Sequence, residues 1–432
     1  MMRRAGREAQ RRRGGAAFAL AVAALGGGGC HPSAAPPRRP SVAVRDSAGV
    51  RIIESGAAAW GPGQGWSIGT APSLDLSAAT TGPDADFGRI VGLTRLSDGR
   101  IVIADGANLL RLFSPAGRFL YTIGGSGRRI GQFRVLQAVF RGPADTMITF
   151  DIGTSTITTF DPNGAVVDTA SIPVDAGSNG YIPEGVTVEG DLVLLRDETP
   201  IPFPGAPWSV RLDSGLVLQV SRKGVFRDMI GRFPSRETFG LPVPRAGDGA
   251  RVLVPANRPL GRVGAFAVRG DTVWISTGAA AEVTAYVGAR AVRTIRIGRS
   301  PAIVPESLIA EYKRRRRADA GPGRGVIDSI YTASLDSMPF PDYLPAQGRI
   351  LVDPAGDLWL QAPGLDDLHP GDATLTWTVL APSGEWLGAV TFPPEFSPRE
   401  IGSDYVLGLW VGDTTGAIHV RLYPLQKPVG GA

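Results

Sequence analysis

The hydrophobic and polar positions of this chain repeat as short apolar runs separated by polar turns. Apolar runs such as Ile101–Ala104 and Leu192–Leu195 each follow a turn that contains Gly and Asp. Five such turns occur, at Leu96–Gly99, Arg141–Asp145, Val188–Asp191, Val268–Asp271 and Asp353–Asp357. Self-similarity at a regular interval is typical of repeat architectures. The pattern predicts a strand, a tight turn and a second strand in five successive units.

A second turn follows in each unit and predicts a further hairpin. Four of these turns have an apolar residue four positions before a Gly: Phe113–Gly117, Phe160–Gly164, Val220–Gly224 and Leu380–Gly384. The spacing suits a hairpin loop in which Gly takes a positive φ. The fourth unit, at Ala285–Arg290, keeps the hairpin but shifts its Gly. Each unit is therefore expected to be four antiparallel strands over roughly 40 to 50 residues, the length of a propeller blade.

The repeats predict an all-β fold, a six-bladed β-propeller of four-stranded antiparallel blades. Five units lie between about Gly88 and Phe392. Tyr405–Trp410 and His419–Tyr423 would supply two strands of a sixth blade, and Val42–Ile53 is expected to supply the other two. Closure by the N- and C-terminal strands would remove the exposed edges of an open array. A run of hairpins in a β-sandwich is the alternative.

Several segments resemble a known group of proteins. Gly99–Asp105, the turn Phe113–Gly117 and the segment Gly124–Phe133 resemble an NHL-type repeat. The whole chain is similar to bacterial envelope six-bladed propeller proteins of uncharacterised function, at Arg45–Val50, Trp66 and Asp404–Gly408. The resemblance implies a binding scaffold, and it brings no general catalytic motif.

The basic character of the chain is confined to its beginning. The sequence has 45 Lys and Arg, 40 Asp and Glu, and a pI of about 9.6. Six Arg and one Glu fall within residues 1–29, so that 39 basic and 39 acidic residues remain. A folded domain that binds nucleic acid needs a surplus of Lys and Arg. We therefore expect no nucleic-acid partner.

The beginning of the chain has the pattern of a secretion signal. Basic residues precede the apolar stretch Ala16–Leu25, which is too short to span a bilayer as a helix. Cys30 follows four glycines and is the only cysteine, and it resembles the lipidation site of bacterial lipoproteins. Ordinary cleavage, for instance after Ala21–Ala23, is the alternative. Because His31 and not Asp follows Cys30, the resemblance favours the outer membrane, facing the periplasm or the cell exterior.

These segments predict the domain organisation. Residues 1–29 are interpreted as a signal peptide, and 30–41, rich in Pro, as an extended tether. The propeller is expected at 42–425, with a helical insertion at about 302–337, and a C-terminal tail at 426–432.

Few residues of the domain suggest catalysis. His369 and His419 are the only histidines after the tether, and the domain has no thiol, so zinc sites built from Cys and His are excluded. The segment Gly125–Gly131 precedes a strand and not a helix, so it is interpreted as a connector. No catalytic residue and no cofactor are predicted.

Three aspartates end the second strands of their units: Asp105, Asp151 and Asp197. The favoured interpretation is a turn in which the carboxylate accepts backbone N–H groups. The alternative is a ring of carboxylates that binds a cation, calcium included, or a polar ligand. Asp84–Gly88 is interpreted as a solvated turn, because it lacks the distal Glu of a calcium loop.

The insertion before the fifth unit supplies the remaining candidates. A helix is predicted from Pro305, and its end carries the basic run Lys313, Arg314, Arg315, Arg316 and Arg317. This run is either a solvated helix end or a surface for anionic lipid headgroups. Phe340 and Tyr343 lie in the apolar segment Ser337–Pro345, a loop of the kind that often binds partners.

Three functions remain open from the sequence. The first is a non-catalytic binding or scaffolding propeller held on the cell envelope by a lipid, with an unknown envelope protein or small ligand as its partner. The second is a carboxylate- and metal-dependent propeller hydrolase or lyase of the gluconolactonase kind. The third is a subunit of a larger envelope complex.

Overall fold

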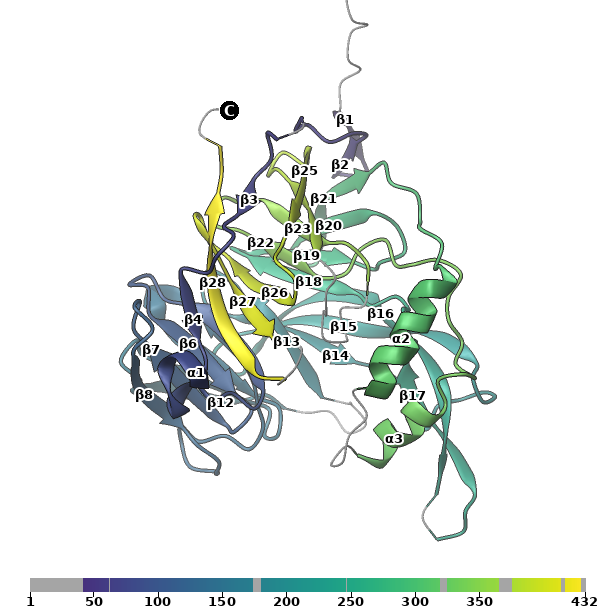
Figure 1. Ribbon diagram of the computed structural model, residues 1–432, viewed down its shortest axis with the longest axis horizontal. Coiled ribbons are helices and arrows are strands. Elements are labelled where there is room, and N and C mark those ends of the chain that lie inside the picture. Colours follow the sequence, from purple (N-terminus) through teal and green to yellow (C-terminus); the bar gives the residue numbers. More distant parts are fainter. Residues whose placement is uncertain are drawn as a thin grey trace, which may run out of the picture. The chain divides into compact units, whose positions relative to one another are not determined.

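The repeat units of the sequence form β-sheets in the computed structural model (Figure 1). The structure describes residues 42–61, 63–173, 180–245, 247–318, 325–364, 375–412 and 416–428. The chain divides between Arg39 and Pro40 into two units, and every described residue belongs to the second. Cys30, the predicted signal segment and the tether lie outside the described residues, as does His369.

Three sheets have the predicted four antiparallel strands, which pair in sequence order. The first contains β5 (Ile90–Arg95), β6 (Ile101–Asp105), β7 (Leu109–Phe113) and β8 (Phe119–Gly124). The second contains β9 (Leu136–Arg141), β10 (Met147–Asp151), β11 (Thr156–Phe160) and β12 (Val166–Ser171). The fifth contains β22 (Ile350–Val352), β23 (Leu358–Gln361), β24 (Thr376–Leu380) and β25 (Trp386–Thr391).

The turn glycines act as the sequence predicts. Gly117 joins β7 to β8 with a φ of 81°, and its N–H donates to the carbonyl of Ser114 at 2.9 Å. A Cβ at this position would lie 2.6 Å from a methyl carbon of Leu74. Both the positive φ and the close approach therefore require Gly.

The third and fourth sheets are larger than predicted. The third contains β13 (Tyr181–Val186), β14 (Leu192–Asp197), β15 (Val210–Val220), β16 (Phe226–Pro244) and β17 (Arg251–Asn257). The fourth contains β18 (Ala265–Arg269), β19 (Thr272–Ser276), β20 (Glu282–Val287), β21 (Arg290–Ile297), β2 (Val50–Ser55) and β1 (Val42–Ser47). The length of β15 and β16 extends the third sheet beyond a blade.

The sixth sheet is built from both ends of the described chain, but the predicted N-terminal segment is wrong. It contains β26 (Phe396–Ile401), β27 (Tyr405–Val411) and β28 (Ile418–Gln426), and β28 pairs with β3 (Ser67–Ile68) and β4 (Leu74–Leu76). The hairpin Val42–Ile53 instead reaches the fourth sheet, where β2 pairs in parallel with β21.

Side-chain burial explains where the N-terminal hairpin goes. Ile53 is buried in an apolar cluster with Ile295 of β21 and Leu380 of β24. On β4, Asp75 forms an ion pair of 2.7 Å with Arg421 of β28 and a hydrogen bond of 2.7 Å with His419 of the same strand. The sequence shows two short N-terminal segments with strand character but does not show which partner each one fits.

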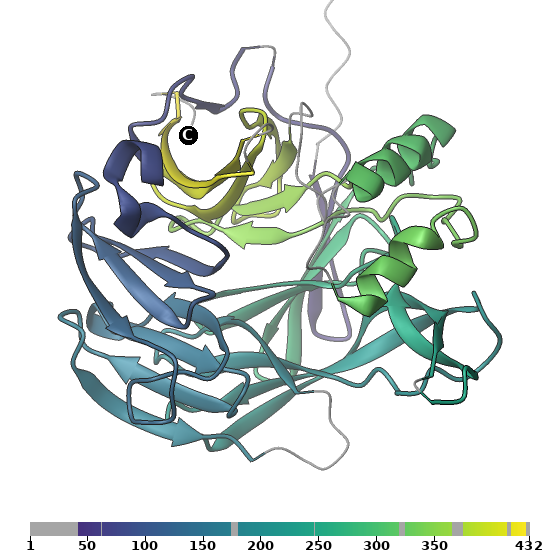
Figure 2. The same cartoon turned by 60° about the horizontal axis from the view of Figure 1, so that its bottom comes forward.

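The six sheets contact one another through their first strands. In order, β5 contacts β9, β9 contacts β13, β13 contacts β18, β18 contacts β22, β22 contacts β26, and β26 contacts β5. Figure 2 shows the sheets of this unit following one another around a common centre. Apolar clusters fill the space between neighbours, and every residue of β6 and β10 is buried. This mostly β arrangement is consistent with a β-propeller.

The helical part lies between β21 and β22, within the range predicted for an insertion. It contains α2 (Glu306–Ala318) and α3 (Val326–Ala333). Tyr312 and Tyr331 of these helices pack in one apolar cluster with Phe239 of β16. Shorter helical segments are α1 (Ala78–Thr81), η1 (Pro83–Ala85) and η2 (Pro143–Asp145). Within the described ranges, no helix has the length and apolar character needed to cross a membrane.

Candidate functional site

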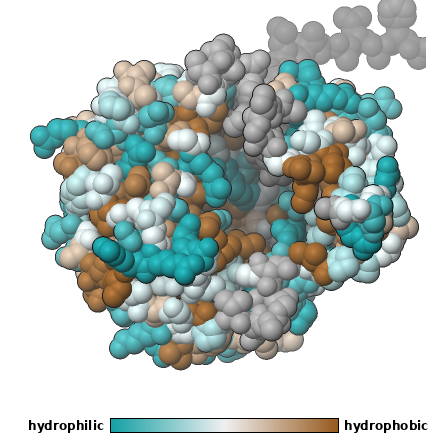
Figure 3. All heavy atoms as spheres, turned by 90° about the horizontal axis from the view of Figure 1, so that it is seen from below, coloured by the Kyte–Doolittle hydropathy of each residue, from teal (hydrophilic) through white to brown (hydrophobic). Residues whose placement is uncertain are grey.

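A cavity of about 530 Å³ lies among the first strands of the third to sixth sheets. Its wall includes Glu184 of β13, Phe266 of β18, Leu351 of β22 and Arg399 of β26. Tyr312 of α2 also contributes, so the helical insertion forms part of the wall. Figure 3 shows a hollow near the middle of the face seen from below. The volume is within the range of small-molecule sites.

Glu184 enters the cavity from a β-bulge in β13. Val186 pairs with Leu192 and Gly185 with Val193, but the next pair joins Pro183 to Leu194 and leaves Glu184 without a partner in the register. An extra residue of this kind re-aims its side chain, and bulges are common beside functional sites.

Arg399 occupies the equivalent bulge in β26. Ile401 pairs with Val406 and Glu400 with Leu407, and the next pair joins Pro398 to Gly408, so that the register skips Arg399. In both strands, therefore, two regular pairs separate the extra residue from the hairpin turn. Two first strands separate β13 from β26 in each direction around the sheets, so the two bulges lie on opposite sides of their centre.

Neither bulge side chain has a polar partner among the described residues. No hydrogen bond or ion pair joins Glu184 or Arg399 to any part of the chain that the structure describes. Burial raises the pKa of Glu184 to about 8. Glu184 is therefore mostly protonated at neutral pH and can donate a hydrogen bond.

The Arg399 side chain lines the cavity and is exposed to the solvent there. Desolvation by the protein around the cavity lowers the pKa of Arg399. A guanidinium nevertheless stays charged in proteins. The cavity thus contains a cation that the described protein does not neutralise, opposite an acid that burial keeps neutral.

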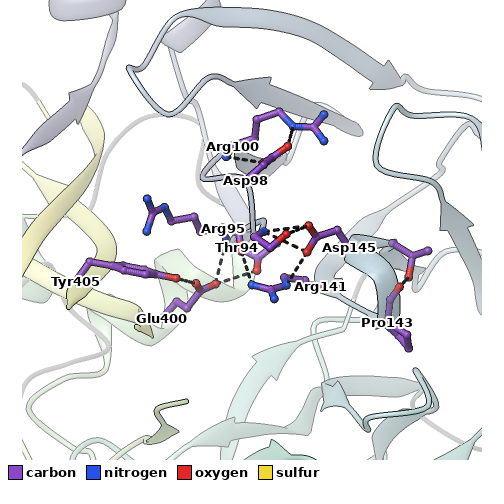
Figure 4. Close-up of polar contacts among 11 residues, drawn as sticks. Thr94, Arg95, Asp98, Arg100, Arg141, Pro143, Asp145, Glu400 and Tyr405 are labelled. Atoms are coloured by element: carbon purple, nitrogen blue, oxygen red, sulfur yellow. Dashed lines mark hydrogen bonds and ion pairs between the residues drawn. The ribbon is translucent and has the colours of Figure 1, made fainter. Parts of the chain in front are cut away.

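The backbone around Arg399 is held from two sides. Arg349 donates to the Ser397 hydroxyl at 2.9 Å and to the Pro398 carbonyl at 3.2 Å. On the other side, Glu400 accepts from the Thr94 hydroxyl at 2.8 Å, from the Arg95 N–H at 3.1 Å and from the Tyr405 hydroxyl at 2.6 Å (Figure 4). These contacts fix the bulge, and burial followed by the charge of Glu400 raises the pKa of Tyr405.

Two buried glutamines on the wall have unpartnered amide atoms. Gln347 is 3% exposed and its Oε1 has no partner among the described residues, while its Nε2 donates to Ser276 and to the Glu282 carbonyl. Gln361 is 1% exposed, and its Nε2 likewise lacks a described partner, although its Oε1 accepts from Arg349 at 3.0 Å. Buried polar atoms without partners are costly, so a ligand that bonds to them would gain affinity.

The three predicted aspartates are the last residues of β6, β10 and β14, and each accepts a backbone N–H of the turn that follows. Asp105 accepts from the Ala107 N–H at 2.8 Å and pairs with Arg111 at 2.9 Å. Asp151 accepts three backbone N–H groups, of Arg134, Val135 and Gly153. Asp197 accepts from Thr199 and pairs with Arg236. None of them lines the cavity.

A metal role for these aspartates stays a prediction. In the described part of the chain, no three or more His, Cys, Asp or Glu side chains gather closely enough to hold a metal ion. Glu184 is the only carboxylate among the described residues that line the cavity. Calcium prefers several charged oxygen ligands, so a single protonated carboxyl is a poor fit.

The basic run of α2 is joined to acidic residues. Arg314 and Arg315 contact Glu311 at 2.6 and 2.5 Å, Arg316 contacts Asp328 at 2.8 Å, and Lys313 and Arg317 contact Asp336 at 3.1 and 2.8 Å. Three carboxylates thus offset part of the five positive charges and connect α2 to α3 and to the segment that follows. Binding of headgroups by this run stays a prediction.

The two aromatic candidates differ in position. Phe340 packs edge-on against Tyr312, with ring centres 5.7 Å apart, and its carbonyl accepts from Arg258 at 3.0 Å. Tyr343 is 58% exposed.

The sequence does not single out the cavity residues Glu184 and Arg399, because a bulge is defined by strand register and not by residue type.

Comparison with solved structures finds proteins of low overall similarity to this chain. A Bacteroides fragilis protein described as a candidate exported protein has a TM-score of 0.44 and 12% identity, over 87% of this chain and 99% of that one. Virginiamycin B lyase from Staphylococcus aureus has a TM-score of 0.39 and 10% identity, over 83% and 99%. A gluconolactonase from Xanthomonas campestris has a TM-score of 0.37 and 15% identity, over 84% and 98%.

The arrangement of the six sheets around a common centre defines the class as a β-propeller-like protein. The similar structures include enzymes and a protein described as exported, and the class follows from the sheet arrangement of this chain and not from them. No family model and no curated protein sequence matches the chain.

Proposed function

We propose that this chain is a non-catalytic binding propeller whose six sheets are the six blades, and that it holds a small ligand in its central cavity. One observation carries the proposal. Glu184 and Arg399 occupy equivalent bulges on opposite sides of the centre, and neither side chain has a polar partner among the described residues. Ionisable side chains that line a cavity without a protein partner are candidates for binding a ligand.

A binding function fits this cavity better than metal-dependent hydrolysis. The gluconolactonase-like alternative needs several carboxylates around a divalent ion, whereas the described wall has one carboxyl, which burial holds protonated. The wall instead offers one cation, one neutral acid and two glutamine amides, a set suited to hydrogen bonding of a polar molecule.

We further propose that the protein acts on the cell envelope, anchored by a lipid on Cys30. Support comes from the sequence: an apolar segment follows basic residues and ends in small residues before the single Cys. Replacement of Cys30 by Ser is expected to release the protein into the soluble periplasmic fraction. Unchanged retention in the membrane fraction would contradict the anchor.

Capture of a molecule from a cell extract tests the binding function. Purified protein is incubated with an aqueous metabolite extract and washed, and the retained molecules are identified by mass spectrometry. Val263 lines the cavity and is 48% exposed, so Val263→Trp should fill the cavity without disturbing the core. Val287 is 47% exposed and does not line the cavity, which makes Val287→Trp the matched control.

The expected result is one retained compound with the wild type and Val287→Trp and its loss with Val263→Trp. Retention of no compound, or equal retention by both variants, would contradict the proposed function.

A further inference from the structure

We propose that the ligand of the central cavity is an organic monocarboxylate, which binds its carboxylate at Arg399 and a polar oxygen at Glu184. The inference rests on the proposed function and names the chemistry of its ligand. Its basis is the position of the two side chains in equivalent bulges of β13 and β26, which face one cavity from opposite sides.

The charge of the cavity favours an anion. The described charged side chains on its wall are Glu184, Arg349 and Arg399. Arg349 is engaged by Gln361, Ser397 and Pro398 and lies over the Trp377 ring at 5.6 Å. Arg399 is left to meet a ligand, and its guanidinium group can pair with an anionic group.

The number of free donors favours a carboxylate over a phosphate. One guanidinium matches a carboxylate with two parallel N–H···O bonds and offsets its single charge. A phosphate at neutral pH carries more charge and further oxygens, and the wall offers no second unengaged Arg or Lys among its described residues.

Glu184 and the glutamines define the other end of the ligand. A protonated Glu184 can donate to a hydroxyl, ether or carbonyl oxygen, and the free Nε2 of Gln361 is a further donor. The free Oε1 of Gln347 is an acceptor for a ligand hydroxyl or N–H. The ligand is therefore expected to be hydroxylated or to contain an amide.

Glu184 also gives binding a pH dependence. Above its pKa of about 8, Glu184 becomes an anion, loses its donor proton and repels a carboxylate across the cavity. Arg349, Arg399 and Tyr312 are the other ionisable groups on the described wall, and the two guanidinium groups stay charged over this range. Affinity should therefore fall as pH rises through about 8.

Matched acid and amide probes test the inference. Binding of glucuronate and glucuronamide, and of N-acetyltyrosine and N-acetyltyrosinamide, is measured by saturation-transfer NMR with glucose 6-phosphate as a phosphate probe. The proteins are the wild type, Arg399→Gln and the control Arg118→Gln, whose side chain is exposed and does not line the cavity.

At least one acid is expected to bind the wild type and Arg118→Gln more tightly than its amide. In Arg399→Gln the affinity for that acid should fall about tenfold to a hundredfold. Failure of both acids to bind, equal binding of acid and amide, or stronger binding of glucose 6-phosphate would overturn the inference. A neutral compound captured from extract and lost in Val263→Trp would also overturn it, while the proposed binding function would stand.

Discussion

The Thr94 hydroxyl of β5 donates a hydrogen bond of 2.8 Å to Glu400 of β26, although 306 positions separate the two residues in the sequence. The bond joins the first sheet to the last (Figure 4). It also fixes the residue that directly follows Arg399, so the closure of the fold and the geometry of the cavity depend on the same contact.

Removal of the Thr94 hydroxyl should lower both the stability of the fold and the affinity of the cavity for its ligand. In Thr94→Val the partly buried carboxylate of Glu400 loses one of three donors, and we expect the free energy of unfolding to fall by about 1 kcal/mol. The affinity for a captured ligand should fall with it. Thr272→Val is the control, since Thr272 lies in β19 and its hydroxyl has no hydrogen bond to any described residue. Equal urea midpoints for both variants would contradict the prediction.

The stability of the protein should depend on the protonation of Glu184. Because burial raises its pKa to about 8, the folded state binds a proton that the unfolded state releases near pH 4.5. Between these two pH values the free energy of unfolding falls as pH rises. A difference of one full proton would give a slope of about 1.4 kcal/mol per pH unit, and we expect Glu184 to contribute part of that slope.

Glu184→Gln should remove the part of the pH dependence of the unfolding free energy that comes from Glu184. Urea unfolding of the wild type and the variant between pH 5 and 9 measures it, and the difference isolates Glu184 from other titrating groups. We expect the variant to gain stability relative to the wild type as pH rises from 5 to 8. A constant difference across this range would show that Glu184 does not retain a proton.

The contact between Lys427, which directly follows β28, and the fifth sheet should contribute to the stability of the fold. Its ammonium group lies 3.0 Å from the buried Asp353 carboxylate and 3.8 Å from Asp357, and 4.0 Å above the Trp66 ring. Burial, followed by the charge and hydrogen bond of Asp353, raises the pKa of Asp357 to about 7, and Lys427 opposes this rise.

Lys427→Met should therefore destabilise the fold by about 2 kcal/mol, less than a fully buried pair would give because Lys427 is partly exposed. Without the ammonium group, the pKa of Asp357 should rise further, and the stability tied to its proton is lost as pH rises through the new value. Addition of Asp357→Asn should restore part of the stability above pH 7. If the double variant is no more stable than Lys427→Met there, the repulsion between the carboxylates is not the cause.

The sequence was sufficient for the parts of the fold that local chemistry determines. Glycines such as Gly117 mark turns because only Gly adopts the required backbone there without a clash. The apolar runs between them, such as Ile101–Ala104, become strands that are buried on both faces. The basic end of α2 was also predicted, because cations favour the C-terminal end of a helix.

Features that depend on pairing could not be predicted in this way. The hairpin Val42–Ile53 joins the fourth sheet because Ile53 fits an apolar cluster that forms only after folding. Glu184 and Arg399 likewise look like ordinary strand residues until the register is known. The aspartates at the strand ends stood out in the sequence, but in the structure their carboxylates are engaged by turns and arginines.

The most direct test of the central claim is native mass spectrometry of the captured ligand with the wild type, the double variant Glu184→Gln and Arg399→Gln, and the control Arg118→Gln. The account predicts one ligand per chain for the wild type and the control, and a dissociation constant at least about tenfold higher for the double variant. An unchanged dissociation constant in the double variant would contradict the claim that the two bulge residues hold the ligand.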